Sequence, residues 1–268
     1  MKSTDTTTKK KISVIADISA NLENVIANAT ELAKAIKGTV EVLYVKAPTD
    51  IVKGDNQLSA MRTLHRDTRD TESKLRSAVE KFSSKTGSKV TYKIAYGNTK
   101  NTIKAYLEKE QPHTVVLGKP KSKFPGIPAS GIPSFIMTAC DANVLVTGDD
   151  QKLHTFEDIS LGVYGNSFED TTSGVLADLN KKTSKPVRLF SVRSEQDAVS
   201  NEENKVQDAV SYVFTEGANV LDGLASYVKR TNTQLFCIPR KSTKESYLQS
   251  DRARQIVQKL DVPVLIVA

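Results

Sequence analysis

Residues 12–45 read ISVIADISANLENVIANATELAKAIKGTVEVLYV, and this stretch decides the fold. Its first six residues are typical of a short buried strand, and apolar residues then recur at three and four positions from Leu22 to Ile36. That spacing predicts an amphipathic helix, which Gly38 is placed to end. VEVLYV, at 40–45, predicts a second strand. A strand, a helix and a strand at this spacing form a βαβ unit, which indicates a parallel sheet.

The alternation of strands and helices continues to about residue 150. Apolar strands are predicted at 90–97, at 114–118 and from Asn143, in the segments VTYKIAYG, TVVLG and NVLVTG. A long helical pattern between residues 58 and 82 precedes the first of these strands. A shorter helix, a loop rich in Pro and Lys and a last helix separate the others. The first half is therefore predicted to be a five-stranded parallel sheet flanked by helices.

Beyond the linker DDQKLHTFED the same order of elements starts again at Ile159. VRLFSV, at 187–192, lies 147 positions after VEVLYV. The offset later contracts to about 120, because a short polar stretch replaces the long helix, and this aligns Gly97 with Gly217.

The repeated order predicts an internal duplication. Two domains are expected, at residues 1–150 and 156–268.

Composition excludes several classes of protein. Hydrophobic residues make up 38% and charged residues 26% of the 268 residues, as in a globular protein with a real core. A polar opening segment, and no run of roughly 20 apolar residues, predict a cytoplasmic protein with no membrane partner. Cys140 and Cys237 lack partners at metal-ligand spacing, so neither a disulfide framework nor a metal site is expected.

The formal charge of +7 belongs to the first half, where 23 Lys and Arg stand against 16 Asp and Glu, while residues 151–268 hold 15 of each kind. An excess of basic residues can attract nucleic acid, a membrane surface or an anionic small molecule. The alternative is that these residues are solvated on exposed helix faces. Aromatic residues are not interleaved with the Lys-rich loop, so nucleic acid is not the expected partner.

The order and spacing of four features in the first half point to a known family. The first strand ends in Asp17, a glycine follows the third strand, Gly118 ends the fourth, and a last helix precedes a terminal apolar strand. With these features the chain resembles the universal stress protein family in its tandem two-domain form. The resemblance implies a stress-response function and two open parallel sheets of the Rossmann-like or flavodoxin-like kind, also called adenine nucleotide alpha hydrolase-like. It further implies that the last strands, at 144–147 and 264–268, pair as a pseudo-dimer within the chain, the alternative being internal strands of separate domains.

Many members of that family bind ATP through a loop after the fourth strand with the pattern Gly, two residues, Gly, nine residues, Gly and then Ser or Thr. Glycines let the backbone approach phosphates, and amide groups at the following helix N-terminus hold the negative charge. Gly118 and Gly131 match the first and third glycines. Lys121 stands at the second, and Ile132 stands at the hydroxyl position, where a one-residue shift of the loop could instead present Ser130 or Ser134.

The resemblance also assigns the remaining residues of the candidate site. Asp17 matches the family Asp that contacts the adenine, with a helix N-cap or a polar strand end as the alternative role. Val45 and Lys46 lie beside the base where the chain leaves the second strand, and Leu117 precedes the first loop glycine. These residues are expected to meet at the carboxyl ends of the strands, where open α/β sheets bind ligands. Lys119 and its neighbouring lysines are expected to meet the phosphates.

The second half has lost most of this chemistry. Tyr164 or Gly165 falls at the position of Asp17, and the loop segment IPRKSTKES contains no glycine. That domain is expected to be a dimerising or scaffolding partner, with Arg240 and Lys241 solvated or attracting an anion.

Two functions stay open at this point. The first is a stress-response or regulatory protein that binds ATP or AMP in its first domain. The second is a nucleotide-independent module that has lost ATP binding and docks an unidentified protein partner. Either can form a homodimer. Motifs such as GxSxG and HExxH are absent, so we expect no enzymatic activity, slow ATP hydrolysis being the weaker alternative.

Overall fold

The structure is a computed structural model that describes residues 10–17, 21–47, 57–86, 89–119, 131–147, 155–165, 174–193, 209–240 and 246–268. The first half contains β1 (Lys11–Ala16), α1 (Leu22–Ile36), β2 (Thr39–Lys46), α2 (Gln57–Thr86), β3 (Val90–Tyr96), α3 (Thr99–Glu110), β4 (Thr114–Gly118), α4 (Ile132–Ala139) and β5 (Asn143–Thr147). The second half contains β6 (Leu161–Tyr164), α5 (Gly174–Asn180), β7 (Val187–Arg193), β8 (Ala209–Thr215), α6 (Val220–Arg230), β9 (Leu235–Pro239), α7 (Ser246–Lys259) and β10 (Val264–Val267). Within these ranges no helix is long and apolar enough to cross a membrane.

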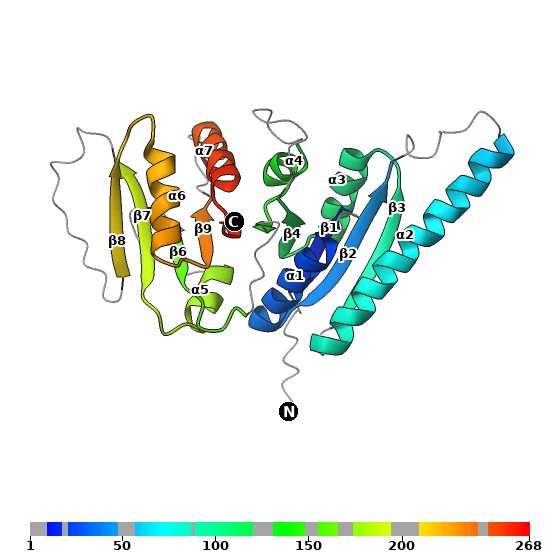
Figure 1. Ribbon diagram of the computed structural model, residues 1–268, viewed down its shortest axis with the longest axis horizontal. Coiled ribbons are helices and arrows are strands. Elements are labelled where there is room, and N and C mark those ends of the chain that lie inside the picture. The colour runs from blue at the N-terminus through cyan, green and yellow to red at the C-terminus, as the bar shows by residue number, and fades with distance from the viewer. Residues whose placement is uncertain are drawn as a thin grey trace, which may run out of the picture.

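The strands join one ten-stranded sheet in the order β3-β2-β1-β4-β5-β10-β9-β6-β7-β8. Neighbouring strands run parallel within each half, and β5 pairs with β10 antiparallel at the junction. The two halves therefore lie side by side, with α2 and β8 at opposite ends of the molecule and the C-terminus near its middle (Figure 1). The expectation of parallel five-stranded α/β units with flanking helices is confirmed, and the two units share one sheet.

The pairing of β5 with β10 is symmetric. Leu145 faces Leu265, and these residues are counterparts in the two halves, while Val146 faces Val264 on one side of them. Each last strand thus meets its own counterpart around a local two-fold axis. The pairing removes one open edge from each half, so that β3 and β8 end the sheet among the strands that the structure describes.

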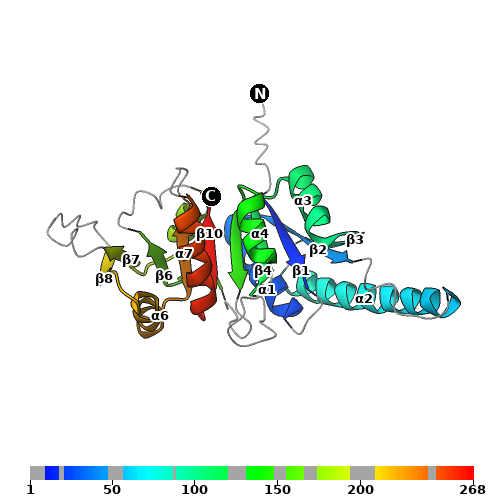
Figure 2. The same cartoon turned by 90° about the horizontal axis from the view of Figure 1, so that it is seen from above.

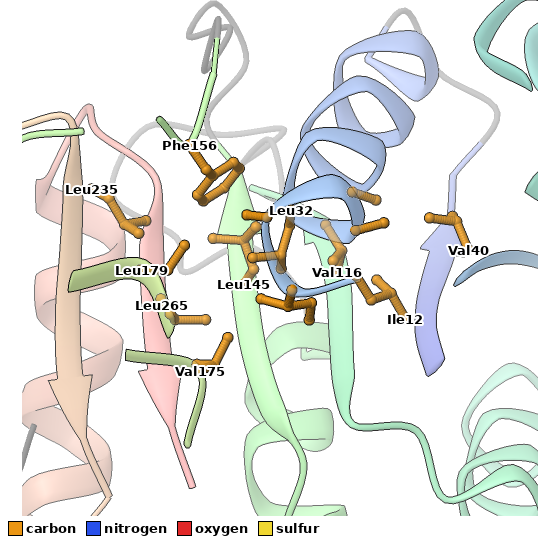
Figure 3. Close-up of a cluster of buried hydrophobic side chains, with 14 of the residues drawn as sticks. Ile12, Leu32, Val40, Val116, Leu145, Phe156, Val175, Leu179, Leu235 and Leu265 are labelled. Carbon is orange, nitrogen blue, oxygen red and sulfur yellow. The ribbon is translucent and has the colours of Figure 1, made fainter. Parts of the chain in front are cut away.

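Helices cover both faces of the sheet. On one face, α1, α2 and α5 pack over a core that runs without interruption from one half to the other (Figure 3). On the other face lie α3, α4, α6 and α7. Full burial of one such side chain contributes about 1.5–3 kcal/mol, so these cores are the main stabilising term. The continuous core includes Ile12, Leu32, Val116, Leu145, Leu179, Leu235 and Leu265.

The two edge strands have different coverings. Tyr92 and Ile94 of β3 are half-buried and pack with the core beneath α2. Their counterparts by strand register are Ser211 and Val213 of β8, which are exposed, and the described part of the second half has no helix equivalent to α2. Smaller and more polar side chains suit a sheet face that no helix covers.

The strand register corrects the sequence alignment at β6. By the pairing of the first two strands in each half, Tyr164 is the counterpart of Ile15, two residues before Asp17. The prediction that Tyr164 or Gly165 replaces Asp17 is therefore wrong. The counterpart of Asp17 is residue 166, which lies outside the described residues.

The register also corrects the alignment after β8. Glu216, and not Gly217, is the counterpart of Gly97. The amide of Gly97 donates to the carbonyl of Lys46 at 3.1 Å, and the amide of Glu216 donates to that of Arg193 at 2.9 Å. Both hydrogen bonds tie the residue after the third strand to the end of the second.

Candidate functional site

The carboxyl ends of β2, β1 and β4 finish at one level on the same edge of the sheet. Ala16 is level with Tyr44, and Ile15 is level with Leu117, so Gly118 follows at the level of Ala16. Because β2 and β4 lie on either side of β1, the strand order switches here. A switch of this kind is where open α/β sheets bind ligands.

Asp17 and Val45 are predicted site residues that lie at this edge. Asp17 directly follows β1 and is exposed, and Val45 is half-buried near the end of β2. The N-cap residue of α1 is Asn21, so Asp17 does not cap that helix, and a polar strand end is the alternative role that stays open. Among the described residues, the Asp17 carboxylate has no ion-pair partner, and it is therefore available to a ligand.

Leu117 and Gly118, the last two residues of β4, both pack closely against helices. Leu117 is buried in the core beneath α3 and α4. A Cβ at Gly118 would lie 3.3 Å from Cγ2 of Val25, tighter than ordinary van der Waals contact. Glycine here lets α1 approach β4 closely, whether or not a ligand binds.

Gly131 and Ile132 stand at the N-terminus of α4. Gly131 is the N-cap residue, and Pro133 lies in the first turn. Free amide groups and the helix dipole favour an anion at such a position. The Nζ atom of Lys100 lies 3.5 Å from the place of a Cβ on Gly131 and over the ring of Phe135. Nothing in the sequence singles out Lys100, because an exposed lysine in the first turn of α3 carries no pattern of its own.

The loop that should contact phosphate is described only at its start. Lys121 and Ser130 lie outside the described residues. Lys119 directly follows β4, and its backbone amide donates to the carbonyl of Thr147 at 2.7 Å. Its Nζ atom donates to the carbonyl of Leu260, in the second half, at 3.0 Å. Lys119 thus contacts the other half of the chain, a role that the sequence did not suggest.

Lys46 is buried, with 4% of its surface exposed. Its Nζ atom donates to Oγ1 of Thr68, on α2, at 3.3 Å. The side chain therefore lies beneath α2, and no ion pair joins it to Asp17. Val45 and the backbone of Lys46 are the groups at this strand end that remain near the predicted base position.

The second half differs from the first at the end of its fourth strand. Pro239 is the counterpart of Gly118, and a proline has no amide hydrogen to offer a ligand. Arg240 is the counterpart of Lys119, and its Nη1 atom donates to the carbonyl of Cys140 at 2.7 Å. The prediction that Arg240 is solvated or attracts an anion is therefore wrong, because this side chain is held against the first half.

A separate polar network lies at the amino end of the sheet. The ammonium of Lys11 lies 2.9 Å from Glu41 and 2.7 Å from Glu110, and the Tyr106 hydroxyl donates to Glu41 at 2.5 Å. Burial opposes the charge of Glu41, but the hydrogen bonds from Lys11 and Tyr106 outweigh it and hold the pKa of Glu41 below its ordinary value. In the part of the chain described, no three His, Cys, Asp or Glu side chains gather as a metal site.

Comparison with known proteins decides the family. The family model described as "Universal stress protein family" matches residues 9–148, more than half of the chain. The chain belongs to the universal stress protein family. No curated protein sequence matches it.

Solved structures extend the likeness of fold over both halves. A universal stress protein from Archaeoglobus fulgidus aligns with a TM-score of 0.64 at 11% identity, over 96% of this chain and 97% of that chain. A functionally unknown protein from Pseudomonas aeruginosa aligns with a TM-score of 0.59 at 13% identity, over 97% and 92% of the two chains. At such low identity these structures share the fold with this member of the universal stress protein family, and their ligands do not transfer to it.

Proposed function

We propose that this universal stress protein is a stress-response regulator whose first half binds an adenine nucleotide, ATP or AMP. The proposal places the nucleotide at the carboxyl ends of β1, β2 and β4, and it makes the second half a structural partner. The supporting observation is the level alignment of these strand ends at the switch in strand order, with the carboxylate of Asp17, which has no ion-pair partner in the described ranges, directly after β1.

Each group at this edge suits a part of the nucleotide. The exposed carboxylate of Asp17 accepts a hydrogen bond from the amino group of adenine. Val45 offers an apolar surface to the base. The N-terminus of α4, with the ammonium of Lys100 beside Gly131, meets the negative charge of the phosphates. The second half lacks this combination, since Pro239 and Arg240 stand at the corresponding loop.

Calorimetric titration with ATP and AMP, with and without magnesium, tests the proposal once nucleotide carried through purification has been removed. One binding site per chain is expected. Asp17→Asn should weaken binding by about tenfold or more, because it exchanges a charged acceptor for a neutral amide. Asp141→Asn is the matched control, because Asp141 is an exposed aspartate at the opposite end of β5.

The second test variant is Gly131→Ala. A Cβ at Gly131 makes only an ordinary contact at 3.5 Å, so the fold should tolerate it, whereas a Cβ at Gly118 would crowd Val25. The added methyl group would keep a phosphate from the backbone at the start of α4. Unchanged titration curves for both Asp17→Asn and Gly131→Ala would remove the site as drawn.

One observation favours a second function, a nucleotide-independent module that docks a protein partner. Lys119, the described lysine of the loop, is bound to the carbonyl of Leu260 in the second half. If the folded protein binds neither ATP nor AMP at millimolar concentration, the nucleotide proposal fails and this second function is favoured.

A further inference from the structure

Lys46 has an environment that the nucleotide proposal does not use. It is the last residue of β2, and the alternation of the strand puts its side chain on the same face as Val42 and Tyr44, beneath α1 and α2. Only 4% of its surface is exposed. Its Nζ atom lies 3.3 Å from the Thr68 hydroxyl oxygen of α2.

Among the described residues, the ammonium of Lys46 has no carboxylate as a countercharge. Among the described residues, Thr68 is its hydrogen-bond partner, and no carboxylate lies within ion-pair distance. At the other end of the sheet the ammonium of Lys11, whose side chain is 27% exposed, lies between the carboxylates of Glu41 and Glu110. Lys11, the more exposed of the two lysines, thus has two carboxylate partners, whereas Lys46, the more buried one, has none among the described residues. Burying an unpaired charge opposes folding, so this arrangement needs an explanation.

We propose that Lys46 and Thr68 form an anion-binding subsite between α2 and the carboxyl end of β2. An ammonium has three hydrogen-bond donors, and the Thr68 oxygen accepts one of them. The other two can donate to the oxygens of a phosphate or carboxylate group, and the Thr68 hydroxyl can donate to the same group.

This subsite is distinct from the expected phosphate position at α4. Lys46 lies beneath α1 and α2, whereas α4 packs on the opposite face of the sheet. The anion is therefore either a second charged group of the bound nucleotide, which rests on the proposed function, or a free anion, which does not. Both sources share the chemistry of a compact oxyanion.

Thermal unfolding of the full chain tests the subsite with inorganic phosphate, AMP and adenosine, each at one ionic strength balanced with chloride. The variants are Lys46→Met, which keeps the length of the side chain and removes the charge, and Thr68→Val, which removes only the hydroxyl. Lys74→Met is the matched control, because Lys74 is an exposed lysine on the same helix. Removing an unpaired charge should leave the Tm of Lys46→Met without anion equal to or above that of the wild type.

The anion-induced rise in Tm should be present in the wild type and in Lys74→Met, lost in Lys46→Met and reduced in Thr68→Val. If phosphate without nucleoside raises the wild-type Tm, the ligand of the subsite is a free anion. That conclusion holds even if calorimetry finds no nucleotide binding. A rise with AMP, but not with phosphate or adenosine, assigns a group of the nucleotide. If Lys46→Met retains the full rise, or if no anion raises the wild-type Tm above the chloride control, the subsite is overturned. Where AMP alone raises the wild-type Tm, nucleotide binding that survives unchanged in Lys46→Met overturns the subsite and leaves the proposed function intact.

Discussion

The side chains of Lys119 and Arg240 cross the junction between the two halves in opposite directions. Lys119 Nζ donates to the carbonyl of Leu260, just after α7, and Arg240 Nη1 donates to the carbonyl of Cys140, just after α4. The two residues are counterparts, and α4 and α7 lie beside one another at the junction (Figure 2). Carbonyl groups at a helix end lack partners within the helix and carry the negative end of its dipole, so each half caps the last helix of the other.

These reciprocal contacts predict a loss of stability when either cation is removed. Arg240→Met should lower the free energy of unfolding by about 1.5–3 kcal/mol, because a charged donor at 2.7 Å is lost from a half-buried carbonyl. Lys119→Met should cost less, about 1 kcal/mol, because its hydrogen bond is longer, at 3.0 Å. Urea unfolding, followed by circular dichroism, measures both changes.

Arg69→Met is the control for these two variants, because Arg69 is exposed on α2, away from the junction. Its unfolding midpoint should stay close to that of the wild type. If Arg240→Met is no less stable than Arg69→Met, the contact of Arg240 with the end of α4 does not stabilise the protein.

The sequence predicted most of the framework but not these contacts. Apolar periodicity from Leu22 to Ile36, and runs such as TVVLG, indicate elements through local spacing alone. The contact of Lys119 with Leu260 joins residues that are 141 positions apart, and nothing local marks it. The burial of Lys46 was equally hidden, because a lysine at the end of a strand ordinarily reaches solvent.

The alignment of the two halves failed where the pattern was ambiguous. Tyr164 was placed on Asp17 because a short apolar run fits several registers equally well, and only its pairing with β7 fixes the register. Asp17 and Gly118 lie at one edge of the sheet as predicted, since the ends of parallel strands share an edge, and their contact with a nucleotide stays a prediction.

Gly162→Ala should destabilise the protein by about 1–3 kcal/mol, because it would overpack the core of the second half. A Cβ at this position would lie 2.8 Å from Cγ2 of Thr233 and 3.1 Å from the rings of Phe190 and Phe236. Gly223→Ala is the control, since its Cβ would meet Phe214 at an ordinary 3.7 Å and alanine favours a helix. Equal thermal midpoints for the two variants would contradict the close packing around Gly162.

The network around Glu41 predicts how stability depends on pH. Its folded pKa lies below the ordinary value of 4.5, because the hydrogen bonds from Lys11 and Tyr106 outweigh the effect of burial. A depressed folded pKa stabilises the protein above the unfolded pKa, and the stabilisation is lost as pH falls through the folded pKa. The difference in unfolding free energy between wild type and Glu41→Gln should therefore be constant from about pH 7 to 5.5 and shrink towards pH 3.

Tyr106→Phe separates the contributions of the two donors to Glu41. It removes one hydrogen bond and keeps the carboxylate beside Lys11, so the pH dependence should lie between those of the wild type and Glu41→Gln. Urea midpoints across this pH range measure it. Parallel stability curves for wild type and Glu41→Gln would show that Glu41 does not carry the dependence.

The central strand pair predicts an energetic coupling between Leu145 and Leu265. Both side chains have 0% exposure, and they face one another across the β5–β10 pair (Figure 3). Leu145→Ala and Leu265→Ala should each cost about 2–5 kcal/mol, and the double variant should depart from their sum by at least about 0.5 kcal/mol, because both truncations open the same part of the core.

Leu43→Ala combined with Leu145→Ala is the matched control, since Leu43 is equally buried but lies three strands away on β2, roughly 14 Å distant. Additive costs in the control and non-additive costs across the junction would show that the two halves share one core. Additivity in both pairs would mean that each half stabilises its last strand independently.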